Sequence, residues 1–234
     1  MIKPTDNLIT MLEPDSAAAE AYRTLRTNLT LRDFDKKIKV INVISTTAQE
    51  SKTTTILNLA YTYSQLGKKV LVIDLDLRLP SIHKKLNIRN KNGLSDVLSG
   101  QVSINEALVH LNESMDVLLA GTKIPFAAEF IQSRALKEFI NGLKEKYSMI
   151  FLDCPPVGLV TDGVIASNLA DGTILCLASG KNDVKDLERT KELLEQMNVN
   201  VLGIVMTRMP IGKKYYDYSY GYTDTTSKKR KGKK

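Results

Sequence analysis

The stretch KVLVIDLDLRLP (residues 69–80) decides the fold class. It begins with a run of aliphatic and β-branched residues and ends with Asp74, Asp76 and Arg78 at alternating positions. A strand this apolar is buried on both faces, which is typical of a parallel strand covered by helices. Charged residues directly after such a strand lie at its carboxyl end, where α/β sheets bind their ligands.

The same apolar pattern recurs along the chain and alternates with helical periodicity. Strands are predicted at 38–45, 69–76, 115–121, 148–154, 172–179 and 199–207, and helices at 16–31, 52–66, 128–145, 161–168 and 184–197. This alternation predicts an α/β fold with a doubly wound, mostly parallel sheet and helices on both of its faces.

The predicted domain organisation is simple. We expect one domain over residues 1–209, in which residues 1–14, with Pro4 and Pro14, form an extended lead-in. A flexible tail rich in Tyr and Lys is expected over residues 210–234.

Composition excludes several classes of protein. The 234 residues are 43% apolar and 25% charged, as in an ordinary globular domain. No apolar run approaches the roughly 20 residues that span a bilayer, and the N-terminus lacks the order of a secretory signal, so a cytoplasmic location is expected. Cys154 and Cys176, the only cysteines, are interpreted as reduced core thiols.

The positive charge is concentrated at the C-terminus. Residues 213–234 hold eight Lys or Arg and two Asp, so they carry +6 of the chain's net +7. The rest of the chain is nearly neutral, which argues against a basic groove for nucleic acid. A basic arm of this kind suits contact with an anionic surface.

The first predicted strand is followed by STTAQESKTTTILNLA (residues 45–60). In a phosphate-binding loop at this position, Lys52 would reach the phosphates and the Thr53 hydroxyl would bind Mg²⁺, at the positive end of a helix dipole. The residues expected to contact the nucleotide are Ala48, Gln49, Glu50, Ser51, Lys52, Thr53 and Thr54.

The loop lacks the glycines that such loops normally contain. Ser51 stands directly before the lysine, and Ala48 and Gln49 occupy positions where Gly and Pro are common. Glycine is used there because the backbone adopts strained angles close to the phosphates. Taken alone, the segment fits equally well a Thr-rich turn that caps a helix.

Three aspartates strengthen the phosphate-site interpretation. Asp74 and Asp76 suit Mg²⁺ binding and general-base work, because burying two carboxylates for the fold alone would be costly. In MIFLDCPPVG (residues 149–158), Asp153 ends a strand as a Walker B carboxylate does. Lys52-Thr53 and the three aspartates follow one another in the order of an ATP-phosphate site, each at the end of a strand.

These motifs together resemble the bacterial tyrosine kinases (BY-kinases) of Gram-positive capsule and exopolysaccharide systems, a MinD/ParA-like branch of the P-loop NTPases. IDLDLR (residues 73–78) resembles the family's second Walker motif, and EAYRTLRTN (20–28) its Glu-x-x-Arg-x-x-Arg element. LLAGTKIPFAAEFIQS (118–133) resembles its proline-rich region. Two family asparagines are replaced, by Phe126 and Thr207.

The resemblance implies an autokinase that transfers the γ-phosphate of ATP to tyrosines of a neighbouring subunit. Lys52 would neutralise phosphate charge, Thr53, Asp76 and Asp153 would hold Mg²⁺, and Asp74 would be the base for the incoming phenol. A transmembrane activator of the polysaccharide co-polymerase type and a cognate tyrosine phosphatase are implied as partners. The activator would hold the protein at the inner face of the membrane.

The resemblance also implies a homo-oligomeric ring, such as an octamer. Glu20, Arg23 and Arg26 would form its subunit contacts. Without the resemblance, these three residues would be interpreted as a solvated helix face with an i,i+3 ion pair.

Five of the nine tyrosines lie within eight residues of the tail, and these are the expected phosphorylation sites: Tyr215, Tyr216, Tyr218, Tyr220 and Tyr222. A mobile arm can enter a neighbour's active site, whereas a folded tyrosine generally cannot. A sticky tail or a β-edge segment is the alternative interpretation.

Two other functions remain open from the sequence. The missing glycines favour a catalytically weak or inactive scaffold of the polysaccharide machinery. A partition-type ATPase of the same branch is the third possibility, although such proteins usually have a second Lys early in the loop, and none occurs from Ser45 to Ser51.

Overall fold

A computed structural model gives the fold of residues 8–33, 35, 37–158 and 162–210. Within these residues, seven strands form a single sheet in the order β3-β4-β2-β5-β1-β6-β7. β3 pairs antiparallel with β4, and all the other neighbours pair parallel. The strands are β1 (Val40–Ser45), β2 (Val70–Asp74), β3 (Leu108–Asn112), β4 (Met115–Leu118), β5 (Met149–Asp153), β6 (Gly172–Ala178) and β7 (Val201–Thr207).

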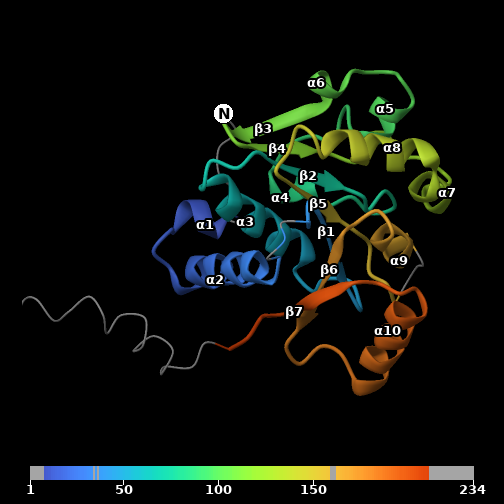
Figure 1. The fold of residues 1–234 in the computed structure, drawn as a ribbon. Coiled ribbons are helices and arrows are strands. Elements are labelled where there is room, and N and C mark those ends of the chain that lie inside the picture. Colours follow the sequence, from blue (N-terminus) through green and yellow to red (C-terminus); the bar gives the residue numbers. More distant parts are fainter. Residues whose placement is uncertain (1–7, 34, 36, 159–161, 211–234) are drawn as a thin grey trace, which may run out of the picture.

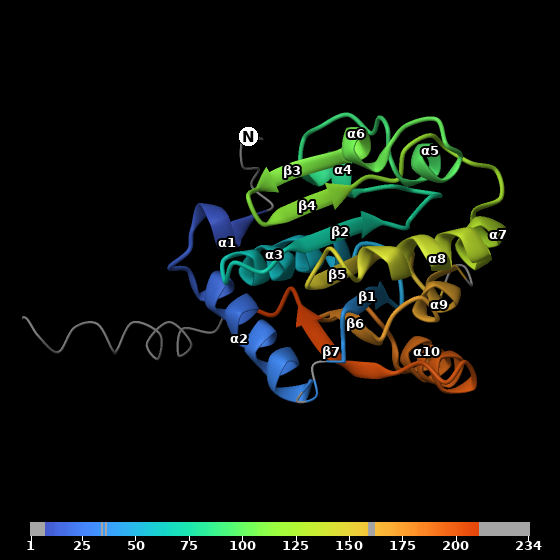
Figure 2. The same ribbon diagram turned by 45° about the horizontal axis from the view of Figure 1, so that its top comes forward.

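Helices cover both faces of the sheet (Figures 1 and 2). One face is packed by α1 (Ile9–Leu12), α2 (Ala17–Arg32), α3 (Lys52–Ser64) and α4 (Ile82–Lys85). The other is packed by α5 (Leu94–Leu98), α6 (Ile104–Ala107), α7 (Ala127–Gln132), α8 (Arg134–Leu143), α9 (Asp162–Ser167) and α10 (Val184–Gln196). The expected doubly wound architecture is confirmed.

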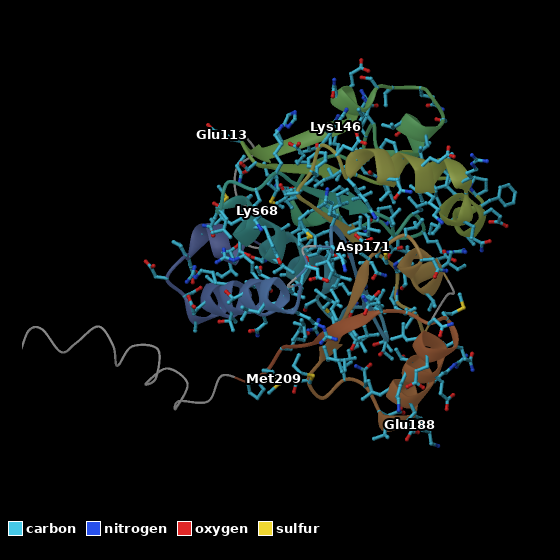
Figure 3. All side chains as sticks on the ribbon, in the orientation of Figure 1. Lys68, Glu113, Lys146, Asp171, Glu188 and Met209 are labelled. Carbon is cyan, nitrogen blue, oxygen red and sulfur yellow. The ribbon has the colours of Figure 1, made fainter. Side chains whose placement is uncertain are left out.

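The central strands feed two separate apolar cores, because successive side chains point to opposite faces of a sheet. In β5, Ile150 and Leu152 enter the core under α8, whereas Phe151 enters the core under α3. There the ring centroid of Phe151 lies 5.7 Å from that of Tyr63. Side chains fill the space between sheet and helices on both sides (Figure 3). Strands buried on both faces account for the continuous apolar runs in the sequence.

The N-terminal prediction was wrong in part. Residues 1–7, including Pro4, lie outside the described residues, but Ile9–Leu12 form a helical turn rather than an extended lead-in. The Thr10 backbone N–H and hydroxyl both donate to Asn58 Oδ1, at 3.0 and 2.9 Å. These bonds tie the turn to α3, a long-range contact that local sequence does not reveal.

Two other local predictions need correction. The single helix predicted over 128–145 is two helices, because Ser133 adopts an extended conformation and its hydroxyl accepts from Leu136 N to cap α8. Strand β3 was not predicted. It is the antiparallel edge of the sheet and only one of its residues, Leu111, is buried, so its apolar signal is weak.

The parallel order brings the predicted site residues to one edge of the sheet. β2 lies beside β5, and Asp74 pairs directly with Asp153 in their register. β1 lies on the other side of β5, and the phosphate loop follows its last residue, Ser45. The carboxyl ends of these three adjacent strands therefore form the floor of the candidate site.

Two expectations from composition can be compared with the structure. Cys154 and Cys176 are both free and buried, as expected for core thiols. Among the described residues, no helix has the length and apolarity needed to cross a bilayer.

Candidate active site

The phosphate loop runs from Thr46 to Ser51, between β1 and α3. Gln49 and Ser51 have φ angles of 58° and 64°, in the left-handed region that favours glycine. The loop therefore adopts the strained backbone of a phosphate-binding loop at two positions without glycine. Lys52 is the first residue of α3 and is 9% exposed, so its ammonium group is held within the site rather than in bulk water.

The buried side chain of Glu50 holds this loop in place through hydrogen bonds. Its carboxylate is completely buried and accepts hydrogen bonds from Thr47 N at 2.8 Å, from Ala178 N at 3.1 Å and from the Asn182 side chain. The Thr207 hydroxyl donates to the Glu50 carbonyl at 3.1 Å. The Glu50 side chain thus anchors the loop to the end of β6, and the Glu50 carbonyl anchors it to the end of β7.

Thr53 joins the loop to the Walker B strand. Its hydroxyl donates to Asp153 Oδ2 at 2.6 Å and lies 2.6 Å from the hydroxyl of Ser81. The second carboxylate oxygen, Asp153 Oδ1, is buried and has no hydrogen-bond partner within the described part of the chain. A buried carboxylate oxygen of this kind normally has a partner, and oxygen ligands from hydroxyl and carboxylate suit Mg²⁺. The residues present therefore fit a divalent cation.

Burial and mutual repulsion raise the pKa values of the acidic residues at this edge. Burial raises the pKa of Asp153 to about 6, opposed by the positive charge of Lys52. Burial, followed by repulsion from Asp153, holds the pKa of Asp74 well above its ordinary value. The pKa of Asp76 is also raised, again mainly by burial. Such a cluster of carboxylates is poised to take up protons or a cation.

The structure separates the two aspartates of the IDLDLR motif. Asp74 is fully buried, and its carboxylate accepts from the backbone N–H groups of Ser81, Ile82 and Asp76, at 3.1–3.2 Å. Asp76 lies past the end of β2, is only partly buried and accepts from Leu79 N at 3.0 Å. Asp74 therefore shapes the segment that follows β2, whereas Asp76 lines the open part of the site.

A cavity of about 320 Å³ lies above the loop. Its walls include the predicted loop residues and Asp76, together with five residues that sequence reasoning missed: Leu79, Ser81, Lys85, Pro156 and Arg208. Four of these five follow a motif that had been recognised: Leu79 and Ser81 come soon after IDLDLR, Pro156 soon after Asp153 and Arg208 directly after the last strand. Lys85 lies in the short helix α4, and no signal in the sequence marked it.

The predicted subunit contacts are arranged along α2. Arg23 Nε lies 2.7 Å from Glu20 Oε2 in an i,i+3 ion pair on the surface. Arg26 instead donates to the backbone oxygen of Thr62 in α3, at 2.6 Å. Glu20 and Arg23 therefore pair with each other on the surface, whereas Arg26 is tied to α3. The five tail tyrosines lie outside the described residues.

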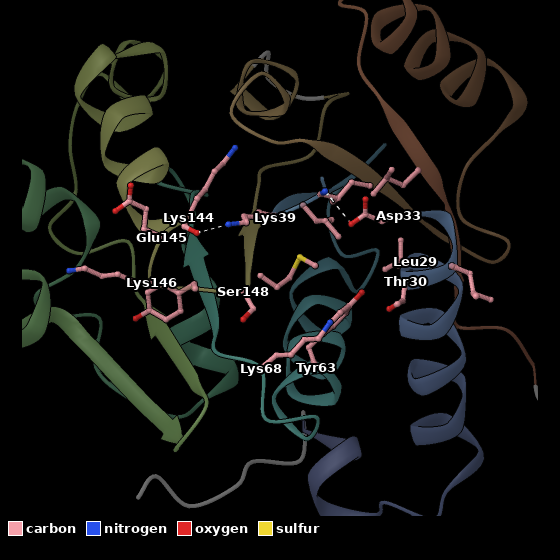
Figure 4. A pocket seen from close by; sticks show the side chains of 16 residues that line it. Leu29, Thr30, Asp33, Lys39, Tyr63, Lys68, Lys144, Glu145, Lys146 and Ser148 are labelled. Carbon is pink, nitrogen blue, oxygen red and sulfur yellow. Dashed lines mark hydrogen bonds between the residues drawn. The ribbon is translucent and has the colours of Figure 1, made fainter. Parts of the chain in front are cut away.

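A larger hollow, of about 700 Å³, lies at the opposite end of the sheet and is not part of this site. Its walls include Lys39, Lys68, Lys144 and Lys146, but their ammonium groups diverge (Figure 4). Lys39 donates to the Lys144 carbonyl at 3.0 Å, and Lys144 pairs with Asp171 at 2.9 Å. Because these ammonium groups point in different directions and two of them already have partners, they do not form an anion-binding site.

The fold and the loop define a P-loop nucleotide-binding protein. Residues 38–201 match the AAA domain family. The tyrosine-protein kinase YwqD of Bacillus subtilis is 38% identical over 94% of this chain and 92% of its own length. The crystal structure of the chimerical protein CapA2B2 superposes with a TM-score of 0.84 at 31% identity, covering 90% of this chain and 93% of that one. The chain belongs to the bacterial tyrosine-protein kinases.

Two more distant similarities concern the nucleotide and the length of the protein. The septum site-determining protein MinD of Pyrococcus horikoshii, solved in complex with Mg-ADP, has a TM-score of 0.60 at 26% identity, over 77% of this chain and 76% of that one. The tyrosine-protein kinase etk of Escherichia coli is 28% identical over 88% of this chain, but the match covers only 28% of that relative. The kinase region can therefore be a small part of a longer chain.

Proposed function

We propose that the protein is an ATP-dependent autokinase that phosphorylates the tail tyrosines of a neighbouring copy. One observation carries the proposal: the loop before Lys52 has the left-handed backbone of a phosphate site, although it lacks the glycines that usually provide it. A Thr-rich turn that merely capped a helix would need neither these two angles nor the carboxylate of Asp153 against Thr53.

Each residue has a role in this reaction. The backbone N–H groups of residues 48–54 and the Lys52 ammonium group bind the phosphates at the positive end of α3. Thr53, Asp76 and Asp153 are the residues that would hold Mg²⁺, directly or through water. When bound, the ion supplies positive charge that neutralises the phosphate oxygens.

Asp74 is the proposed base for the phenol of the incoming tyrosine. Its raised pKa suits proton uptake, but the N–H groups of Ser81 and Ile82 cover Oδ2 in this structure. We therefore propose that Ser81 and Ile82 move away from Asp74 when the acceptor binds, so that Oδ2 is uncovered. Asp76, which already lines the cavity, remains on the phosphate side of the acceptor.

The cellular role proposed here is control of capsule or exopolysaccharide synthesis and export. Membership of the bacterial tyrosine-protein kinases supports a transmembrane activator of the polysaccharide co-polymerase type as a partner. A ring of subunits, such as an octamer, would bring each tail to a neighbour's site, and a tyrosine phosphatase would reverse the reaction. The protein would then work at the inner face of the membrane.

The decisive experiment separates the kinase site from the acceptor. A Lys52→Met variant keeps its tail but lacks the phosphate-binding ammonium group. A second variant, with Phe at positions 215, 216, 218, 220 and 222, keeps the site but lacks the acceptors. The two variants are incubated with Mg-ATP, each alone and both together. If phosphotyrosine forms on the Lys52→Met chain only in the mixture, the phosphate was transferred between copies.

The same mixture tests the competing interpretation. It should be run with and without the cytoplasmic segment of the activator, and the wild-type chain serves as the positive control. If neither the wild type nor the mixture forms phosphotyrosine under any condition, the kinase proposal fails and the scaffold interpretation replaces it.

A further inference from the structure

Ser81 forms hydrogen bonds with both Thr53 and Asp74. Its hydroxyl lies 2.6 Å from Thr53 Oγ1, and its backbone N–H donates to Asp74 Oδ2 at 3.2 Å. It also lines the cavity above the phosphate loop. Ser81 thus links the side of the site that would hold the cation to the side that holds the proposed base.

The direction of these hydrogen bonds follows from counting protons. A threonine hydroxyl has one proton and two lone pairs, and an ionised carboxylate only accepts. Because Thr53 donates its proton to Asp153 Oδ2, the contact between the hydroxyls of Thr53 and Ser81 has to be donated by Ser81. One lone pair of Thr53 is therefore occupied by Ser81, which leaves a single lone pair for a ligand.

The position of the Ser81 hydroxyl is itself fixed by the backbone. The N–H groups of Ser81 and Ile82 both donate to the buried carboxylate of Asp74. Ser81 also precedes the short helix α4, whose first residue, Ile82, is completely buried. Before an acceptor binds, the backbone that carries this hydroxyl is therefore held by Asp74 on one side and by the buried Ile82 on the other.

We propose that Ser81 is a positioning residue of the nucleotide site: its hydroxyl orients Thr53 so that the remaining lone pair faces the divalent cation that accompanies the nucleotide. Partners of this kind behind a metal ligand typically contribute a factor of 10–100 to metal affinity. Nothing in the IDLDLR motif assigns this role, because Ser81 lies outside it, beyond Pro80. The inference rests on the proposed nucleotide function.

The test is an equilibrium binding measurement on the full chain, not an assay of activity. The affinity of ADP is measured by calorimetry in the presence of Mg²⁺ and again in EDTA, for the wild type, Ser81→Ala and Ser81→Thr. We expect Ser81→Ala to weaken Mg-ADP binding about tenfold and to leave metal-free ADP binding unchanged. Ser81→Thr, which keeps a hydroxyl, should restore Mg-ADP affinity to within about twofold of the wild type.

A matched control is Ser99→Ala, in which the hydroxyl removed donates to the Asp96 carbonyl at the end of α5, remote from the cavity. The inference is overturned if Ser81→Ala binds Mg-ADP like the wild type, or if it loses metal-free ADP binding to the same extent. It is also overturned if Ser81→Thr is as weak as Ser81→Ala, since packing would then explain the loss. A wild-type chain that binds no ADP under either condition refutes the proposed function itself, and the inference with it.

Discussion

Gln49 and Ser51, two residues apart in the phosphate loop, both hold left-handed backbone angles, with φ of 58° and 64°. A residue with a Cβ atom is strained in this region by about 1–2 kcal/mol, whereas glycine is not. The loop therefore stores strain at two positions, and the surrounding structure maintains it. Strain of this kind is typical of functional sites.

Replacing Ser51 by Gly should relieve this strain. We expect Ser51→Gly to raise the free energy of unfolding by about 1 kcal/mol, because the gain exceeds the extra backbone entropy that glycine gives the unfolded chain. Urea denaturation provides the measurement. Ser99→Gly is the control, since Ser99 has an ordinary φ of −82° and should lose stability instead. A loss for both variants would show that Ser51 is not strained.

The buried carboxylate of Glu50 should be sensitive to loss of its charge. In Glu50→Gln, an amide NH₂ group would face the donors Thr47 N, Ala178 N or Asn182. We expect a loss of about 2 kcal/mol in the free energy of unfolding, the range for hydrogen bonds to a charged group. Glu188→Gln, on the exposed side of α10, is the control and should be neutral. Equal stabilities of the two variants in urea would contradict the anchoring role of Glu50.

The two cysteines predict how stability depends on alkaline pH. Burial raises the pKa of Cys176 to about 12 from an ordinary value of 9.0, and burial also raises that of Cys154. Between about pH 9 and 12 the folded chain keeps thiol protons that the unfolded chain releases. The free energy of unfolding should therefore fall as pH rises through this window, by up to about 1.4 kcal/mol per pH unit for each thiol.

The measurement for this prediction is urea denaturation at several pH values between 8 and 11. The slope with pH should be shallower for Cys176→Ala than for the wild type, although the variant is less stable at every pH. The folded wild-type protein should also react with a thiol reagent at pH 8 only as fast as it opens. Rapid labelling of either cysteine without denaturant would refute the placement of both thiols in the core.

Arg26 should behave differently from its two predicted partners on α2. Because it donates to the Thr62 carbonyl, we expect Arg26→Ala to lower the free energy of unfolding by about 1 kcal/mol. Glu20→Ala and Arg23→Ala remove only an exposed ion pair and should leave stability within about 0.5 kcal/mol of the wild type. Light scattering on the same variants measures their oligomeric state separately from their stability. Arg23→Ala is the better test of a role in the ring, because it should leave stability nearly unchanged.

The fold could be predicted from sequence wherever burial on both faces left a continuous apolar run. Strands β1, β2, β4, β5 and β6 have such runs, and the edge strand β7 has an apolar run although only its Leu202 is buried. The predicted boundaries of these strands differ from the observed ones by at most three residues. Strand β3 was not predicted because His110 and Asn112 interrupt the apolar residues of its sequence LVHLN. The turn at Ile9–Leu12 depends on Asn58, which lies 48 residues from Thr10 in the sequence.

The candidate site was predictable to the extent that its chemistry is carried by residue types. Lys52, Thr53 and Asp153 were recognised from their order after strands, and the structure brings the last two into contact. Ser81 and Arg208 were missed because a serine after Pro80 and an arginine after a strand are common in loops. The absence of glycine from the loop was misleading for a different reason. A residue other than glycine makes a left-handed backbone angle more costly, but it does not prevent the chain from adopting that angle.

The position of β1 in the middle of the sheet has a consequence for how the chain reaches this state. β1 pairs with β5 and β6, and the partner of Val40 is Ile150, about 110 residues later. At synthesis rates of roughly 5–20 residues per second, β1 and the phosphate loop wait on the order of 5–20 seconds for their neighbours. The nucleotide site therefore cannot form until β5 has been synthesised, and until then the apolar strand β1 lacks its partners in the sheet.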